Sequence, residues 1–329
     1  MSQHEERTDM DKALMDSAMI AVKDCLKVVE GEKLLVVTDS ELLGIGTALV
    51  EAGRRLGATS VIMEMQPLSR NGEEPPEMVS EAMKFADAVV CPTSKSLTHT
   101  AARRNACAAG SRVATMPGIT LDTMVRCLNA DYYAIADRTH EMTALLDAAK
   151  TARVTTALGT DLTIPIDGIK AISSTGLIHD PGSFGNLPSG ESYMMPEEEK
   201  AHGVFIVDGS MAGIGDLAGK TPITIRVEGG YAVEITGGPE ADELRSKLEA
   251  VGKKAFHAAE LGVGTNDAAK IIGNILEDEK VMGTVHIALG NNMSMGGTFD
   301  VPIHLDGIIK DPTLELDGKI VMDAGRLLI

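Results

Sequence analysis

Short continuous aliphatic runs separated by amphipathic stretches characterise the first 151 residues of this chain. The runs predict buried parallel strands and lie at 33–39, 60–65, 87–92 and 112–116. The stretches around them have the spacing of apolar residues typical of helices and lie at 11–29, 40–57, 77–85, 98–109, 120–128 and 138–151. This alternation of strands and helices predicts an α/β fold with a doubly wound, mostly parallel sheet.

After Ala152 the pattern changes to short strand-like segments with few helices between them. Strands are predicted at 153–157, 161–165, 168–177, 203–208, 223–228 and 231–236. Gly229-Gly230 predicts a hairpin turn between the last two. A long helix at 239–252 and a short one near 267–276 interrupt the series. We therefore predict two domains, a Rossmann-like α/β domain at 1–151 and an α+β, strand-rich, metal-binding domain at 152–329.

A segment near the end of the chain places two metal-binding side chains together. His304 and Asp306 alternate with the aliphatic residues Val301, Ile303 and Leu305, so a strand would send both polar side chains to one face. Imidazole nitrogen and carboxylate oxygen are ligands that divalent Zn, Mn, Co and Fe accept. We interpret this pair as ligands of a metal ion.

His286 lies in a second strand-like segment of the same kind. It would share a face with the small residues Thr284 and Ala288, so we expect its ring to face open space. The segment 291–297, which follows this strand, is too polar and rich in glycine to belong to the core. We expect it to form the rim of the same site.

Two glutamates have surroundings that suit a bound carboxylate. Glu191 lies in the loop 186–193, beside a proline and glycines that can hold its backbone near a cleft. Glu260 is flanked by small and apolar residues, where a charge without a partner is costly and a metal would stabilise it. From the pattern alone, a surface or capping role is the alternative for each of them.

His257 and Lys280 are open to more than one interpretation. In a helix His257 would share a face with Glu260, whereas in a strand the two would point apart, which leaves His257 as a neighbour of the site or a plain core or surface histidine. Lys280 ends the charged run 277–280, for which a solvated helix end is the simplest interpretation. It is also close enough to His286 in sequence to be a candidate for polarising a substrate.

Composition excludes several classes of function. The formal net charge is −18 with a pI near 4.8, and no cluster of Lys and Arg offsets it. Such a surface repels nucleic acid and anionic membranes, so we expect neither as a partner. No apolar run approaches the roughly 18 residues of a membrane span, and the start of the chain is polar and acidic, so we expect a cytoplasmic protein. The four cysteines lack metal-binding spacing and are expected to be reduced thiols.

Two motifs of the first domain have weaker functional interpretations. Gly44-Ile-Gly46 lacks the third glycine of a dinucleotide-binding fingerprint and lies too far beyond the strand, so helix packing is the preferred interpretation. The polar segment 93–96 follows the third predicted strand, at the edge of the sheet where open α/β folds bind ligands. A helix cap is the alternative there.

Four motifs of the second half also occur in the same order in a known family. They are Asn186-Leu-Pro-Ser-Gly-Glu191, the glutamate of Ala259-Glu260-Leu-Gly262, the run from Asp278 to Gly290, and Ile303-His304-Leu-Asp306. They resemble the motifs of the M29 metallo-aminopeptidases, the aminopeptidase T and aminopeptidase S family. The resemblance implies a homodimeric enzyme that releases N-terminal residues from short peptides. It also implies two divalent ions, Zn, Co or Mn, held by Glu191, Glu260, His286, His304 and Asp306, with Glu191 or Glu260 transferring the proton of the attacking water.

The chain departs from this family in one place. A tyrosine usually follows the glycine of the His-x-x-x-Gly motif, whereas 291–295 contains none. Two other hypotheses are therefore kept. The dihydroxypyridine dioxygenases resemble distant relatives of the same fold and use one Fe(II), for which His304 and Asp306 with His286 or His257 would be the ligands. A peptide-binding or metal-binding homologue without turnover is the third hypothesis.

Overall fold

A computed structural model describes residues 3–329, and the chain in it forms two compact units. The first unit comprises the residues up to Ala134 together with Gly176–Ser189, and the second comprises Ile135–Thr175 and Gly190–Ile329. The chain therefore crosses between the units more than once. A single division at Thr151 would leave most of one long helix, and one short strand, with the other unit.

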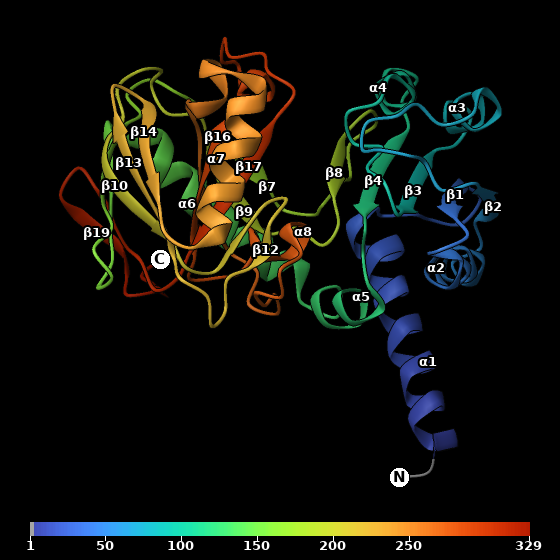
Figure 1. Cartoon of the computed structure of the whole chain (residues 1–329). Helices are drawn as coiled ribbons and strands as arrows, with labels where there is room; N and C mark the ends of the chain where they lie inside the picture. Colours follow the sequence, from blue (N-terminus) through green and yellow to red (C-terminus); the bar gives the residue numbers. More distant parts are fainter. Residues whose placement is uncertain (1–2) are drawn as a thin grey trace. The chain divides into compact units, whose positions relative to one another are not determined.

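The first unit is built on a five-stranded parallel sheet (Figure 1). Its strands, in spatial order, are β2 (Thr59–Met65), β1 (Lys33–Asp39), β3 (Ala88–Thr93), β4 (Arg112–Pro117) and β8 (Phe184–Asn186). The central strands β1 and β3 are buried along almost their whole length, as their continuous aliphatic sequences predict. The prediction of a doubly wound parallel sheet followed by a strand-rich part is confirmed.

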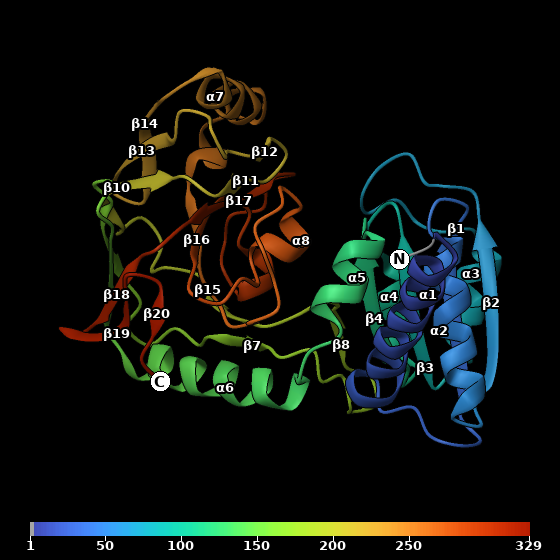
Figure 2. The same cartoon turned by 90° about the horizontal axis from the view of Figure 1, so that it is seen from below.

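Helices cover both faces of this sheet (Figures 1 and 2). One face carries α1 (Gln3–Met19), its π-helical continuation η1 (Ile20–Cys25), α2 (Leu43–Arg55) and α5 (Leu121–Cys127). The other face carries α3 (Glu77–Met83) and α4 (Ala101–Ala108). From β1 the chain first moves to β2 on one side and then returns to β3 and β4 on the other side. Because both kinds of crossover are right-handed, their helices lie on opposite faces of the sheet.

A shallow hollow of about 340 Å³ lies at the carboxyl ends of these strands, lined by Glu41, Leu42, Ser94, Lys95, Gly118, Ile119 and Thr120. Asp39 at the end of β1 accepts hydrogen bonds from the backbone N–H and the hydroxyl of Ser94, at 2.6 and 2.7 Å. The hydroxyl of Thr100 accepts a hydrogen bond from the N–H of Arg103 and caps α4. The polar side chains after β3 thus act in turns and caps.

The second unit contains two antiparallel sheets. The eight-stranded sheet has the order β14 (Tyr231–Thr236), β13 (Ile223–Glu228), β10 (His202–Val207), β6 (Asp161–Pro165), β5 (Thr151–Thr155), β18 (Thr313–Leu316), β19 (Lys319–Asp323), β20 (Arg326–Leu327). The seven-stranded sheet has the order β12 (Gly215–Asp216), β11 (Ser210–Met211), β17 (His304–Ile309), β16 (Val285–Gly290), β15 (Ala258–Gly264), β9 (Glu191–Met194), β7 (Ile172–Ser174). Helices α6 (Tyr132–Ala148) and α7 (Pro239–Val251) pack on them.

One hydrophobic core joins both sheets of the second unit with the helices α6 and α7. Leu261, Ile287 and Leu289 of the seven-stranded sheet are at most 1% exposed and belong to the same cluster as Leu162 and Phe205 of the other sheet. Alternate residues of each strand point to opposite faces. The face of β15, β16 and β17 that turns away from this core is therefore free to carry other chemistry.

Several element boundaries differ from the sequence-based prediction. Only Ile172–Ser174 of the predicted strand 168–177 pairs with a neighbour, because Gly168 and Gly176 have positive φ values of 75° and 80° and bend the chain. The helix expected near 267–276 is instead α8 (Ile275–Asp278), whose first turn is capped by the side chain of Asn274. The three C-terminal strands were not predicted.

Other expectations concerned membranes and cysteines. Within residues 3–329, none of the helices combines the length and the apolar character needed to cross a membrane. The four cysteines are free thiols, as predicted.

We expect truncation of a core side chain to cost far more stability than truncation of a nearby exposed one. Leu162 is 0% exposed within the core of the second unit, whereas Leu158 is 57% exposed. Leu162→Ala should lower the free energy of unfolding by about 2–5 kcal/mol and Leu158→Ala by less than about 0.5 kcal/mol, measured by urea denaturation. Equal losses would show that the core is not as described.

Candidate metal centre

Three neighbouring strands bring polar side chains to one face of the seven-stranded sheet. Glu260 in β15 lies opposite Ala288 in β16, and Ala288 lies opposite Asp306 in β17. His304 lies opposite Gly290 by the same register. Residues directly opposite each other point to the same side of a sheet, about 5 Å apart. The small side chain of Ala288 therefore leaves a space between the carboxylates of Glu260 and Asp306.

His286 lies on the same face, two residues before Ala288. It is opposite Gly262 of β15, which in turn is opposite Tyr193 of β9. A Cβ atom added to Gly262 would lie 1.9 Å from Nε2 of His286, so the imidazole ring extends over the place where a side chain of β15 would be. Gly262 is therefore required for this ring position. Contrary to expectation, His286 does not face open space, since it is 0% exposed.

Glu191 completes the set of five side chains expected at the site. It begins β9, opposite Gly264 of β15, and is therefore on the face that carries His286. Glu191, Glu260 and Asp306 are buried, with 6–7% of each residue exposed. The side chain of His304 is 33% exposed and marks the side from which solvent reaches the site. The structure thus brings all five residues together.

Glu260 connects the two histidines. Its Oε1 lies 3.3 Å from Nε2 of His286, and its Oε2 lies 3.2 Å from Nε2 of His304. Nε2 of His304 is also 3.3 Å from Oδ1 of Asp306. Nδ1 of His304 lies 2.7 Å from the carbonyl oxygen of Asn291, so an N–H there would donate to this carbonyl and leave Nε2 to bind a metal. The segment 291–297 therefore does border the site.

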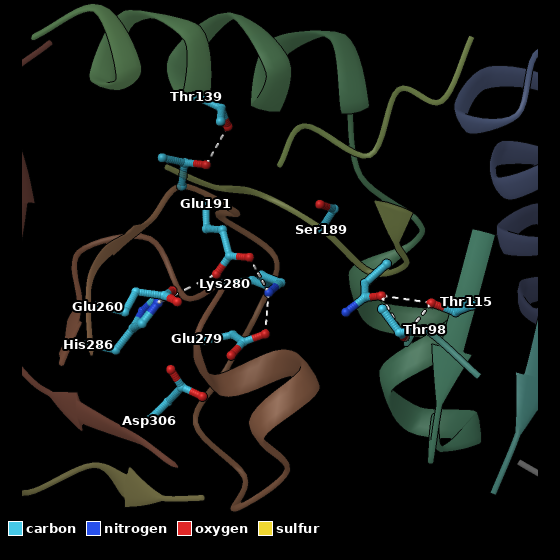
Figure 3. A network of polar contacts seen from close by, with 12 residues as sticks. Thr98, Thr115, Thr139, Ser189, Glu191, Glu260, Glu279, Lys280, His286 and Asp306 are labelled. Atoms are coloured by element: carbon cyan, nitrogen blue, oxygen red, sulfur yellow. Dashed lines mark hydrogen bonds and ion pairs between the residues drawn. The ribbon is translucent and has the colours of Figure 1, made fainter. Parts of the chain in front are cut away.

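A second cluster of charges lies beside the first (Figure 3). The ammonium of Lys280 is 2.6 Å from Oε1 of Glu191 and also contacts Oε1 of Glu279. The Lys280 side chain is 1% exposed, and Glu277 and Asp278 are buried as well. The predicted solvated helix end at 277–280 is therefore wrong. Two backbone hydrogen bonds turn the chain inward after α8. The N–H of Asn266 donates to the carbonyl of Lys280, and the carbonyl of Asn266 accepts from the N–H of Met282.

Burial and mutual attraction shift the pKa values of these groups in opposite directions. Burial would raise the pKa of Asp306, but the adjacent imidazole of His304 lowers it to about 2. Burial would lower the pKa of His286, but Glu260 and Glu191 raise it to about 9. The pKa of Glu279 is raised to about 8, chiefly by burial. For Lys280, Glu191 and Glu279 outweigh burial and hold the pKa above its ordinary value.

The donor atoms of this face suit a divalent cation. Two groups of three side chains have ligand atoms within 4.8 Å of one another: Glu260 with His304 and Asp306, and Glu191 with Glu279 and His286. Oε2 of Glu191 is buried and has no hydrogen-bond partner among residues 3–329. Four carboxylates share the site with one lysine and two histidines, so a bound cation would take over the compensation of carboxylate charge that the protonated histidines provide in its absence.

His257 is not part of this cluster. Its ring is 0% exposed and stacks on the ring of Phe299, with centroids 3.7 Å apart, and meets Tyr231 edge on. Burial lowers its pKa to about 4. Of the interpretations left open by the sequence, a core histidine is the one that these contacts support.

Sequence reasoning missed three residues of the site. Glu279 was assigned to a solvated helix end, and Tyr193 was not among the candidate site residues. Gly262 was not singled out, and it lies inside β15, which continues to Gly264. The available signal was a glycine inside a strand-like segment, because such a glycine often permits another group to approach the backbone closely. Gly262 is that glycine, and the group that approaches is the ring of His286.

Comparison with known proteins identifies the family. Residues 15–329 match the family model described as NicX, 2,5-dihydroxypyridine 5,6-dioxygenase. The chain belongs to this family.

One relative carries the same description as the family, and two solved structures share the fold. The 2,5-dihydroxypyridine 5,6-dioxygenase of Pseudomonas putida is 26% identical over 200 residues, and the match spans 56% of each chain, about half of that relative. The solved structure of 2,5-dihydroxypyridine dioxygenase from Pseudomonas putida KT2440 has a TM-score of 0.80 at 21% identity, covering 95% of this chain and 96% of that one. Wild-type AmpT from Thermus thermophilus has a TM-score of 0.70 at 19% identity, covering 97% and 99%.

The prediction of a metallo-aminopeptidase, and of a hydrolase in general, is wrong. The family match covers nearly the whole chain and names a dioxygenase, whereas the likeness to AmpT shows a shared fold. The motifs that suggested a peptidase are those that build the sheet face and its donor atoms.

We expect Gly262→Ala to displace the His286 ring, because the added Cβ would lie 1.9 Å from Nε2. The affinity for Zn(II), measured by competition with a chromogenic chelator, should fall by at least about tenfold. Gly44→Ala is the matched control, since a Cβ at Gly44 meets nothing within 4 Å. Unchanged affinity in Gly262→Ala would show that His286 plays no part in metal binding.

We expect metal binding to release protons and to tighten as the pH rises. The pKa of His286 is raised to about 9 in the metal-free protein, and a metal needs the neutral ring. The raised pKa also means that protonated His286 stabilises the metal-free fold. This contribution is complete below about pH 6.5 and is lost as the pH rises towards 9. Zn(II) affinity measured between pH 6.5 and 9 should therefore increase. A flat profile over this range would contradict the assigned protonation state.

Proposed function

We propose that this protein is a ring-cleaving dioxygenase that uses one Fe(II) ion and acts on a dihydroxypyridine. The observation that carries the proposal is the meeting of Glu260, His286, His304 and Asp306 on one sheet face, in a chain that belongs to the 2,5-dihydroxypyridine 5,6-dioxygenase family. Two histidines with carboxylates are a donor set typical of non-haem Fe(II) oxygenases.

Glu260, His304 and Asp306 would hold the ion, because their ligand atoms lie within 4.8 Å of one another. His286 is the second histidine near enough to take part, since its Nε2 is 3.3 Å from Glu260. His257, which the sequence left as an alternative, packs against Phe299 instead. When bound, Fe(II) supplies the one-electron chemistry that allows dioxygen to react with an aromatic ring.

The chain's own residues would position the substrate and move its proton. The partly exposed ring of His304 marks the side from which a flat, polar molecule can enter. A dihydroxypyridine gains charge when a hydroxyl group ionises, so a nearby group must accept that proton. Glu279, with a pKa raised to about 8, can gain or lose a proton close to neutral pH and is suited to this role. Tyr193 lies on the same sheet face and can donate a hydrogen bond.

The proposal predicts Fe(II)-dependent oxygen uptake with 2,5-dihydroxypyridine. His304→Ala should lower the rate by at least about 100-fold, because it removes a ligand atom at Nε2. His202→Ala, in an exposed residue of β10, should leave the rate unchanged. Oxygen consumption and loss of the pyridine absorbance are the two measurements.

Two results would reject this function. One is an iron-loaded, folded protein that consumes no oxygen with any dihydroxypyridine tested. The other is oxygen uptake that His304→Ala leaves intact.

A further inference from the structure

The site has donor atoms for two cations, but one of the two groups already contains a cation of its own. Glu191, Glu279 and His286 place ligand atoms within 4.8 Å of one another. The ammonium of Lys280 contacts one oxygen of each of these two glutamates. The ammonium therefore occupies one oxygen of each carboxylate and places a positive charge beside the position that a second metal ion would take.

We propose that Lys280 takes the place of a second metal ion, so that the site holds a single divalent cation. The inference deepens the proposed function, on which it rests for the identity of that cation as iron. It assigns to Lys280 a positioning role, because the ammonium acts through Glu191 and Glu279 on the number of ions bound.

The backbone holds Lys280 in this position. Its carbonyl accepts a hydrogen bond from the N–H of Asn266 at 2.9 Å, and the N–H of Met282 donates to the carbonyl of Asn266 at 3.0 Å. Gly264 allows this close approach, since a Cβ there would lie 2.1 Å from the carbonyl oxygen of Val281. The lysine is therefore fixed against β15 and does not reach the site as a mobile surface side chain.

Electrostatics make the ammonium and a second ion mutually exclusive. The Lys280 side chain is 1% exposed and that of Glu191 is 9% exposed, so little solvent separates charges here. In such surroundings a divalent ion between Glu191 and Glu279 would be repelled strongly by the ammonium. Within residues 3–329 Lys280 forms no hydrogen bond or ion pair with Glu260, His304 or Asp306, so this other group stays free to bind its ion.

A purely structural salt bridge would have a different consequence. If Lys280 only stabilised the fold, its replacement would weaken the protein without changing the number of ions bound. The number of ions per chain is therefore the quantity to measure, and it needs no turnover.

The test counts Zn(II) per chain by equilibrium dialysis and mass spectrometry of the metal. The wild-type protein should bind one Zn(II), Lys280→Met should bind two, and Lys280→Arg, which keeps the charge, should bind one. Lys280→Gln also lacks the charge, but its amide can still donate hydrogen bonds to Glu191 and Glu279. It therefore serves as the uncharged variant if Lys280→Met is too unstable to fold. It should bind two as well. Circular dichroism verifies folding in each case.

Two zinc ions in the wild-type protein, or one in folded Lys280→Gln, would overturn the inference. Failure of the proposed function gives a different pattern. Counts that change from one to two in a protein without oxygenase activity would reject the dioxygenase and keep the role of Lys280. An active Fe(II) dioxygenase whose wild-type chain binds two Zn(II) ions would keep the proposed function and reject the role of Lys280.

Discussion

The cost of burying negative charge is the constraint on which this structure depends. Glu191, Glu260 and Asp306 are almost fully removed from solvent, and Glu279 is only slightly more accessible. Carboxylates in such surroundings must be protonated, paired or bound to a metal. Here one lysine and two histidines compensate the charge, and a divalent cation could replace the protons that the histidines carry. Stability and cation binding are thus set by the same groups.

The central strands serve two purposes because their side chains alternate. In β16, Val285, Ile287 and Leu289 enter the hydrophobic core, while His286 and Ala288 point to the site. A shift of the register by one residue would exchange these two sets and destroy both core and site. The packing of the core therefore fixes the positions of the side chains that the strands carry, and the carbonyl oxygen of Asn291 in the following loop further orients the ring of His304.

The same fold carries different chemistry in different proteins. AmpT and the dihydroxypyridine dioxygenase both superpose on this chain over nearly its full length, at 19% and 21% identity. A shared fold alone therefore does not identify the reaction, which must be argued from the residues of the site. In this chain Glu279, Lys280 and Tyr193 lie next to the predicted ligands.

The sequence alone determined the local patterns: the buried parallel strands, the change to alternating strands after Ala152, and the shared face of His304 and Asp306. These follow from side-chain periodicity, which needs only neighbouring residues. Tertiary structure decided what lies across the strands, because pairing register depends on residues far apart in the chain. It placed the His286 ring over Gly262 and buried the Lys280 ammonium between two carboxylates, where local charge pattern had indicated exposure to solvent.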